Sequence, residues 1–158
     1  MSVTAWTRAA TVSLLVAGAV AIGGQWLAGG FGSRPQPALG PGDVTVTIDL
    51  EHSRFLPDRL RVVEGTRVRF VVDNADPIHH ELIVGPPELH DRHAGGTEAE
   101  HPSVPGEVSV GAGVRAVTTY AFDEVGTVEF ACHLPGHYEY GMHGTIEVVP
   151  AGAGGAAR

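Results

Sequence analysis

Hydrophobic and polar residues alternate along most of the chain after residue 43, as they do in strands with one buried face. The first such segment is VTVTIDL at 44–50, and the segments at 59–63 and 67–72 flank a Glu-Gly turn. Four further short segments with strand character follow, at 81–84, 114–122, 126–132 and 144–149. None of them has the apolar repeat of a helix. The pattern predicts an all-β Greek-key sandwich of about seven strands.

The start of the chain has a different pattern, because residues 9–32 are mostly apolar and contain no charged residue. At about 1.5 Å per residue, a helix of this length would cross a hydrocarbon core of about 30 Å. We expect residues 1–32 to form a single hydrophobic helix that acts as a signal-anchor. The protein would then be a single-pass protein of the cell membrane, with its domain outside the cytoplasm. A cleaved secretory signal, leaving a periplasmic or secreted protein, is the alternative.

Composition marks the remaining boundaries. Residues 33–43 form a Pro/Gly linker, residues 44–150 hold all the predicted strands as one domain, and residues 151–158 form a flexible tail. Within the domain, the polar insertion at 86–107 is expected to be a surface loop. Three histidines of this insertion are candidate ligands for a second metal: His90, His93 and His101. The simpler interpretation is a solvated polar loop without a metal.

Charge and cysteine content narrow the function. The chain carries 18 acidic and 10 basic residues and a formal charge of -8, which argues against a nucleic-acid partner. A single cysteine rules out an internal disulfide, so its thiol is free, buried or a metal ligand.

That cysteine lies in the segment ACHLPGHYEYGMHG, residues 131–144. Cys132, His137 and Met142 follow the spacing C-x4-H-x4-M. Soft thiolate and thioether ligands favour copper, and a His₂Cys site with a weak axial Met is the blue-copper arrangement. Structural zinc would need more thiolates. The second histidine is expected from HHELIV, where His79 and His80 precede a strand that would hold either ring rigidly.

With these motifs, residues 44–150 resemble the cupredoxins, the plastocyanin/azurin class of small blue copper proteins. The C-x4-H-x4-M loop, the segment FLPDRLRVVEGTRVRFVVDN and the segment HHELIVG carry the resemblance. In the family the upstream ligand His is followed by Asn or Glu, which implies His80 rather than His79. The resemblance implies one type 1 copper ion as cofactor, with four ligands: His80, Cys132, His137 and Met142.

The family also ties the residue after the first ligand to the residue after the cysteine. Here these residues are Glu81 and His133. We therefore expect a Glu81 oxygen within about 2.7–3.2 Å of a group on residues 132–134.

The resemblance implies an electron carrier rather than an enzyme, since four protein ligands leave no position for a small-molecule substrate. Single electrons would pass between redox partner proteins, bound transiently, at the outer face of the membrane. One alternative is a membrane-tethered protein of copper binding and homeostasis, and another is the electron-accepting domain of a larger oxidase complex. The loop also resembles the type 1 site of multicopper oxidases, but their trinuclear cluster needs H-x-H pairs, and the chain has none.

Overall fold

The computed structural model describes residues 36–96 and 100–152. The predicted N-terminal hydrophobic helix and most of the predicted tail lie outside these ranges. Among the described residues, no helix is long and apolar enough to span a membrane.

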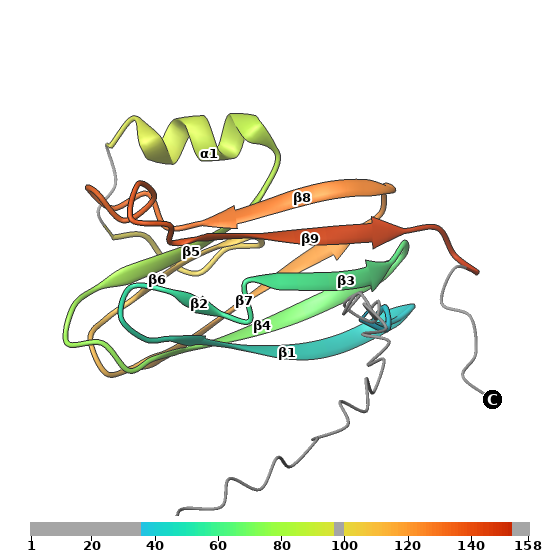
Figure 1. The fold of residues 1–158 in the computed structure, drawn as a ribbon, viewed down its shortest axis with the longest axis horizontal. Coiled ribbons are helices and arrows are strands. Elements are labelled where there is room, and N and C mark those ends of the chain that lie inside the picture. The colour runs from blue at the N-terminus through green and yellow to red at the C-terminus, as the bar shows by residue number, and fades with distance from the viewer. Residues whose placement is uncertain (1–35, 97–99, 153–158) are drawn as a thin grey trace, which may run out of the picture. The chain divides into compact units, whose positions relative to one another are not determined.

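In the described ranges, nine strands pair into two sheets that form the layers of a sandwich (Figure 1). One sheet has the order β2-β1-β4-β7 and the other the order β3-β9-β8-β5-β6. The strand bounds are β1 Gly42–Leu50, β2 Phe55–Leu56, β3 Arg59–Val63, β4 Thr66–Asn74, β5 His80–Gly85, β6 Glu107–Val110, β7 Arg115–Phe122, β8 Gly126–Ala131 and β9 His143–Val149.

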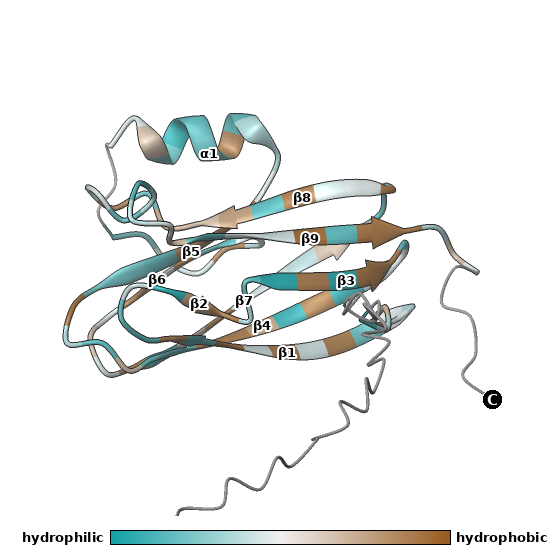
Figure 2. Ribbon diagram, in the orientation of Figure 1, coloured by the Kyte–Doolittle hydropathy of each residue, from teal (hydrophilic) through white to brown (hydrophobic). Residues whose placement is uncertain are grey.

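The core forms between the sheets because most strands present apolar side chains to one face only. In β4, Val68, Phe70 and Val72 are buried, whereas Arg67 and Arg69 are exposed. Figure 2 shows the resulting alternation of hydrophobic and hydrophilic positions along the strands. β5 is the exception, since all its residues are buried. A strand covered on both faces indicates that something packs against its outer side as well.

That covering element is α1, an eight-residue helix at Pro87–Ala94 on the outer side of the five-stranded sheet (Figure 1). The sequence pattern predicted a surface loop over 86–107 with at most a helical turn, so the full helix was not predicted. The helix buries His90 and His93 rather than apolar residues, so it carries no hydrophobic repeat. Its start is marked by proline and by Glu88 in the first turn, both common there, but no side chain caps it.

The seven predicted strands are all present, and the alternation failed only for short elements. β1 begins at Gly42, two residues earlier than predicted. β2, of two residues, and β6, of four residues, were not predicted. Segments this short hold too few alternating positions to give a periodic signal.

Strand register brings the predicted ligand segments to one end of the sandwich. β5 and β8 are antiparallel with Ile83 opposite Ala131, so the residues just after β8 continue alongside the start of β5. β8 and β9 are antiparallel with Ala131 opposite His143, which places Met142 beside Cys132. The upstream histidine, the cysteine and the methionine therefore converge although they are far apart in the chain.

Candidate metal centre

The loop between β8 and β9 is held by its own backbone hydrogen bonds. The amide of Cys132 donates to the carbonyl of Met142 at 3.0 Å, and the amide of Met142 donates to the carbonyl of His137 at 3.0 Å. Gly136 has a φ of 82°, a left-handed conformation that glycine adopts without strain, and it turns the chain just before His137. These backbone hydrogen bonds and the turn at Gly136 thus bring Cys132, His137 and Met142 close together.

His80 begins β5 and is almost completely buried, at 1% exposure. Its Nε2 lies 2.9 Å from Oδ2 of Asp76. The Asp76 carboxylate is itself held by the amides of His52 and Ser53, at 2.8 and 2.7 Å. Burial acts to raise the pKa of Asp76, but these hydrogen bonds outweigh it and hold the pKa below its usual value. Asp76 therefore stays ionised and orients the ring, as carboxylates do for metal-binding histidines.

The orientation of His80 leaves its Nδ1 facing the other predicted ligands. His80 Nδ1 is 3.2 Å from His137 Nδ1, which is in turn 3.2 Å from Cys132 Sγ. All three ligand atoms lie within 4.8 Å of one another. Burial lowers the pKa of His80, so its ring is neutral and able to bind a metal at neutral pH.

Cys132 is fully buried. Burial raises the pKa of its thiol to about 12, and the amides of Glu81 and Leu134 only partly oppose that rise. A soft cation would replace the thiol proton, and the imidazole rings of His80 and His137 complete a donor set that suits copper. The residues present therefore fit a copper ion.

Met142 is also fully buried, within the same core as Cys132. Its backbone is bonded to both Cys132 and His137, which keeps it next to the three polar ligands. We refer to His80, Cys132, His137 and Met142 as the Cys132 cluster. The structure brings all four predicted ligands to one end of the sandwich.

The predicted contact of Glu81 is confirmed. The amide of His133 donates to Oε1 of Glu81 at 2.7 Å. Extending the register of β5 and β8 by two residues places these residues opposite each other, which explains the contact. The partner is the backbone rather than the His133 ring, and burial, with His90 and His93 nearby, lowers the pKa of that ring.

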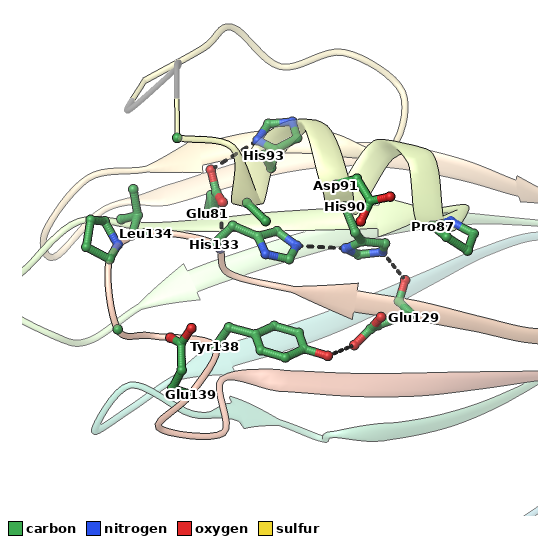
Figure 3. A pocket seen from close by; sticks show the side chains of 14 residues that line it. Glu81, Pro87, His90, Asp91, His93, Glu129, His133, Leu134, Tyr138 and Glu139 are labelled. Atoms are coloured by element: carbon green, nitrogen blue, oxygen red, sulfur yellow. Dashed lines mark hydrogen bonds and ion pairs between the residues drawn. The ribbon is translucent and has the colours of Figure 1, made fainter.

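The remaining histidines separate into distinct roles. His79 is exposed and pairs with Glu100 at 3.0 Å, away from the Cys132 cluster. His90 Nδ1 lies 2.9 Å from His133 Nε2, and its Nε2 is 3.3 Å from the carbonyl of Glu129 (Figure 3). His90 therefore does not join His93 and His101, with which it was considered as a second metal site.

Two supporting residues were not predicted from the sequence. Asp76 stands four residues before His80, and this spacing was the available signal. Asn74 bridges the ends of β4 and β6, because its Nδ2 donates to the carbonyls of Ile78 and Gly111 at 2.8 and 2.9 Å. Together they hold the loop that presents His80.

Comparison with known proteins agrees with this geometry. Curated relatives include the copper-resistant cuproprotein CopI of Rubrivivax gelatinosus, 38% identical over 99 residues, which are 60% of this chain and 59% of that protein. The CopI of Pseudomonas aeruginosa is 28% identical over 152 residues, covering 76% of this chain and 83% of that protein. This chain thus matches less than two thirds of the length of the Rubrivivax relative.

Among solved structures, auracyanin A of Chloroflexus aurantiacus, described as a blue copper protein, shares the fold with a TM-score of 0.57. The identity is 22%, and the match covers 68% of this chain and all of auracyanin A. The family of copper binding proteins, plastocyanin/azurin family, matches residues 42–149, which contain every strand described above. The chain therefore belongs to the plastocyanin/azurin family of copper-binding proteins.

Proposed function

We propose that this chain is a type 1 copper protein that acts in copper tolerance, with one copper ion held by the Cys132 cluster. The observation that carries the proposal is the convergence of one buried thiol and two ring nitrogens, with the two shortest separations both 3.2 Å. Copper bound to such a set supplies single-electron chemistry, because thiolate, imidazole and thioether ligands accept both Cu(I) and Cu(II).

The residues around the cluster support binding rather than catalysis. His80, Cys132 and Met142 are buried, and only His137 is partly exposed. Four protein ligands leave no position where a small-molecule substrate would bind. Asp76 and the loop hydrogen bonds hold the ligands before any metal arrives, so little ordering opposes binding.

The names of the curated relatives support the role in copper tolerance, since both are called copper-resistant cuproproteins. A pre-organised site with a buried thiol would keep bound copper from reacting with other molecules. This role corresponds to the copper-homeostasis alternative, and the names of the relatives favour it over electron transport.

Electron transfer is the second candidate, and the position of His137 favours it. Its ring is partly exposed, and its neighbours Leu134 and Pro135 are apolar and also reach the surface. A redox partner protein would contact this surface, and transient redox contacts of this kind are small. A partner of the acidic chain would be neutral or basic.

For either role we expect the domain to lie outside the cytoplasm. The apolar run at 9–32 lies outside the described residues, and either a membrane anchor or a cleaved signal would export the domain. Washing membranes with high salt separates the two, since an anchored chain stays with the membrane and a cleaved one is recovered in solution.

Growth of the host on copper tests the proposed function. Cells that lack the chain should become sensitive to copper, and the full chain should restore tolerance whereas the Cys132→Ser variant should not. Met142→Leu separates the two roles, because it should keep copper but change the potential. Tolerance restored by Met142→Leu supports copper binding, and slowed reduction of a partner supports electron transfer. Tolerance restored by Cys132→Ser would contradict the proposal.

A further inference from the structure

A second group of metal-binding side chains lies on the opposite face of β5 from the Cys132 cluster. Glu81 of β5, His93 of α1 and His101 of the following segment offer one ligand atom each, all within 4.8 Å of one another. We refer to these residues as the Glu81 cluster. Successive side chains of a strand point to opposite faces, so His80 and Glu81 face different clusters although they are adjacent.

The Glu81 cluster is buried and incompletely bonded. The side chains of Glu81, His93 and His101 are 2%, 3% and 7% exposed. His101 Nε2 is buried and has no hydrogen-bond partner among the described residues. Buried polar atoms are nearly always bonded, so an unpartnered ring nitrogen aimed at a carboxylate calls for a ligand.

The separations are those of metal ligands rather than of hydrogen bonds. Glu81 Oε2 is 3.5 Å from His93 Nδ1 and 3.7 Å from His101 Nε2, beyond the usual hydrogen-bond range. Ligands about 2.1 Å from a shared ion in tetrahedral or trigonal geometry are about 3.4–3.6 Å apart. Because all three atoms lie within 4.8 Å of one another, an ion could be bound between them after small adjustments.

His93 is oriented as His80 is. Its Nε2 lies 2.8 Å from Oε2 of Glu107, and Arg92 holds that carboxylate at 2.8 and 2.9 Å. These contacts hold the pKa of Glu107 below its usual value, although burial acts to raise it. The ring therefore has a carboxylate on one nitrogen and turns the other, Nδ1, toward Glu81. This carboxylate–histidine arrangement is typical of metal ligands.

An access route leads to the cluster. A cavity of about 590 Å³ is lined by Glu81 and His93 and by residues of the β8–β9 loop (Figure 3). His101 lines a separate hollow, together with His79 and Ser109. An ion could reach the buried ligands without unfolding of the sandwich.

We infer that Glu81, His93 and His101 form a second metal site, which binds a divalent transition cation through two imidazoles and one carboxylate. The absence of sulfur favours Cu²⁺ or Zn²⁺ over Cu⁺, and Cu²⁺ binds such ligands more tightly than Zn²⁺. The Cys132 cluster selects a soft ion and this site a harder one. The inference does not depend on the function proposed above, because the two sites share no ligand.

Zinc binding to the full chain tests the inference. The protein is first loaded with one equivalent of copper, which fills the Cys132 cluster, and is then titrated with Zn²⁺ and freed of unbound metal. We expect one bound zinc ion per chain, and its loss in His93→Gln and in His101→Gln. Glu107→Gln should weaken zinc binding by about 10–100-fold, because it removes the carboxylate that orients His93. His52→Gln is the matched control, since that exposed histidine also stands beside a glutamate.

Two further measurements keep the outcomes separate. An unchanged thermal unfolding curve and copper spectrum show that each variant is folded. In Cys132→Ser titrated with Zn²⁺ without added copper, the zinc ion that His101→Gln removes should still bind, so failure of the type 1 assignment leaves this test intact. No zinc or cupric ion beyond the first copper, or zinc that His101→Gln retains, would overturn the inference. The cluster would then be a buried histidine–carboxylate ion pair.

Discussion

His80 and Glu81 are neighbours on β5, yet they belong to two clusters that are built from different elements of the fold. The Cys132 cluster is assembled from strand ends and one short loop, so its ligands are placed by the sheet register itself. The Glu81 cluster depends on α1 and the segment after it, which pack on the outer face of the sheet. Two of its three candidate ligands, His93 and His101, therefore lie outside the sheets.

The two clusters also share a feature that explains their rigidity. Each contains a histidine whose Nε2 is held by a carboxylate, Asp76 for His80 and Glu107 for His93. Glu81 connects them, because its Oε1 accepts the amide of His133 and its Oε2 faces His93. A change at one cluster is therefore expected to be felt at the other, and variants should separate their contributions.

Cys132→Ser should have the largest effect. A hydroxyl does not replace a thiolate as a copper ligand, so most of the copper affinity and all of the thiolate-to-copper absorption should be lost. Copper titration followed by visible absorption measures both. A copper-loaded variant that keeps its colour would show that Cys132 is not a ligand.

His80→Ala should remove nearly as much copper, whereas His79→Ala should leave binding and colour unchanged. Only His80 has a ring nitrogen beside Cys132 and His137, since His79 is exposed and pairs with Glu100. The two variants differ by one position, which makes them a matched pair in copper titration. The reverse result would show that the wrong histidine was assigned.

Glu81 variants should separate its two contacts. Glu81→Gln keeps an oxygen for the His133 amide but loses the carboxylate, so it should lose zinc and retain an ordered loop. Glu81→Ala should lose both the zinc ion and the ordered loop. Hydrogen exchange of the His133 amide should then accelerate by about tenfold or more, since such a hydrogen bond contributes about 1.5–3 kcal/mol. Copper should remain bound in both. Equal exchange in the two variants would contradict a role for Oε1 in holding the loop.

Met142→Leu should have the smallest effect. Copper and colour should remain, but the reduction potential should rise, because loss of a weak donor destabilises Cu(II) relative to Cu(I). Electrochemical titration of the full chain measures the shift. An unchanged potential would place the Met142 thioether away from the metal.

The sequence predicted the strands and the loop motif, which depend on residues close together in the chain. It did not predict features that depend on contacts between distant residues. Alternation and one short apolar run predicted the seven main strands, and the C-x4-H-x4-M spacing indicated three candidate ligands because they lie on one loop. The choice of His80 and the contact of Glu81 came from family resemblance. The hydrogen bond of Glu81 is confirmed, and the ligand role of His80 remains a prediction.

The helix and the supporting carboxylates that were missed place polar residues at buried positions. α1 buries His90 and His93, so hydrophobic periodicity could not reveal it. Asp76 and Glu107 act on histidine rings through tertiary packing, and in the sequence they resemble ordinary surface carboxylates. The convergence of His93 and His101 on Glu81 likewise needs the helix and the sheet together.

The visible absorption spectrum of the full chain with one equivalent of Cu²⁺ tests the central claim most directly. If the Cys132 cluster binds the ion, the spectrum should show an intense thiolate-to-copper band that disappears on reduction to Cu(I). Only weak absorption, as from nitrogen and oxygen ligands alone, would contradict the assignment of Cys132, His80 and His137 as the type 1 copper site.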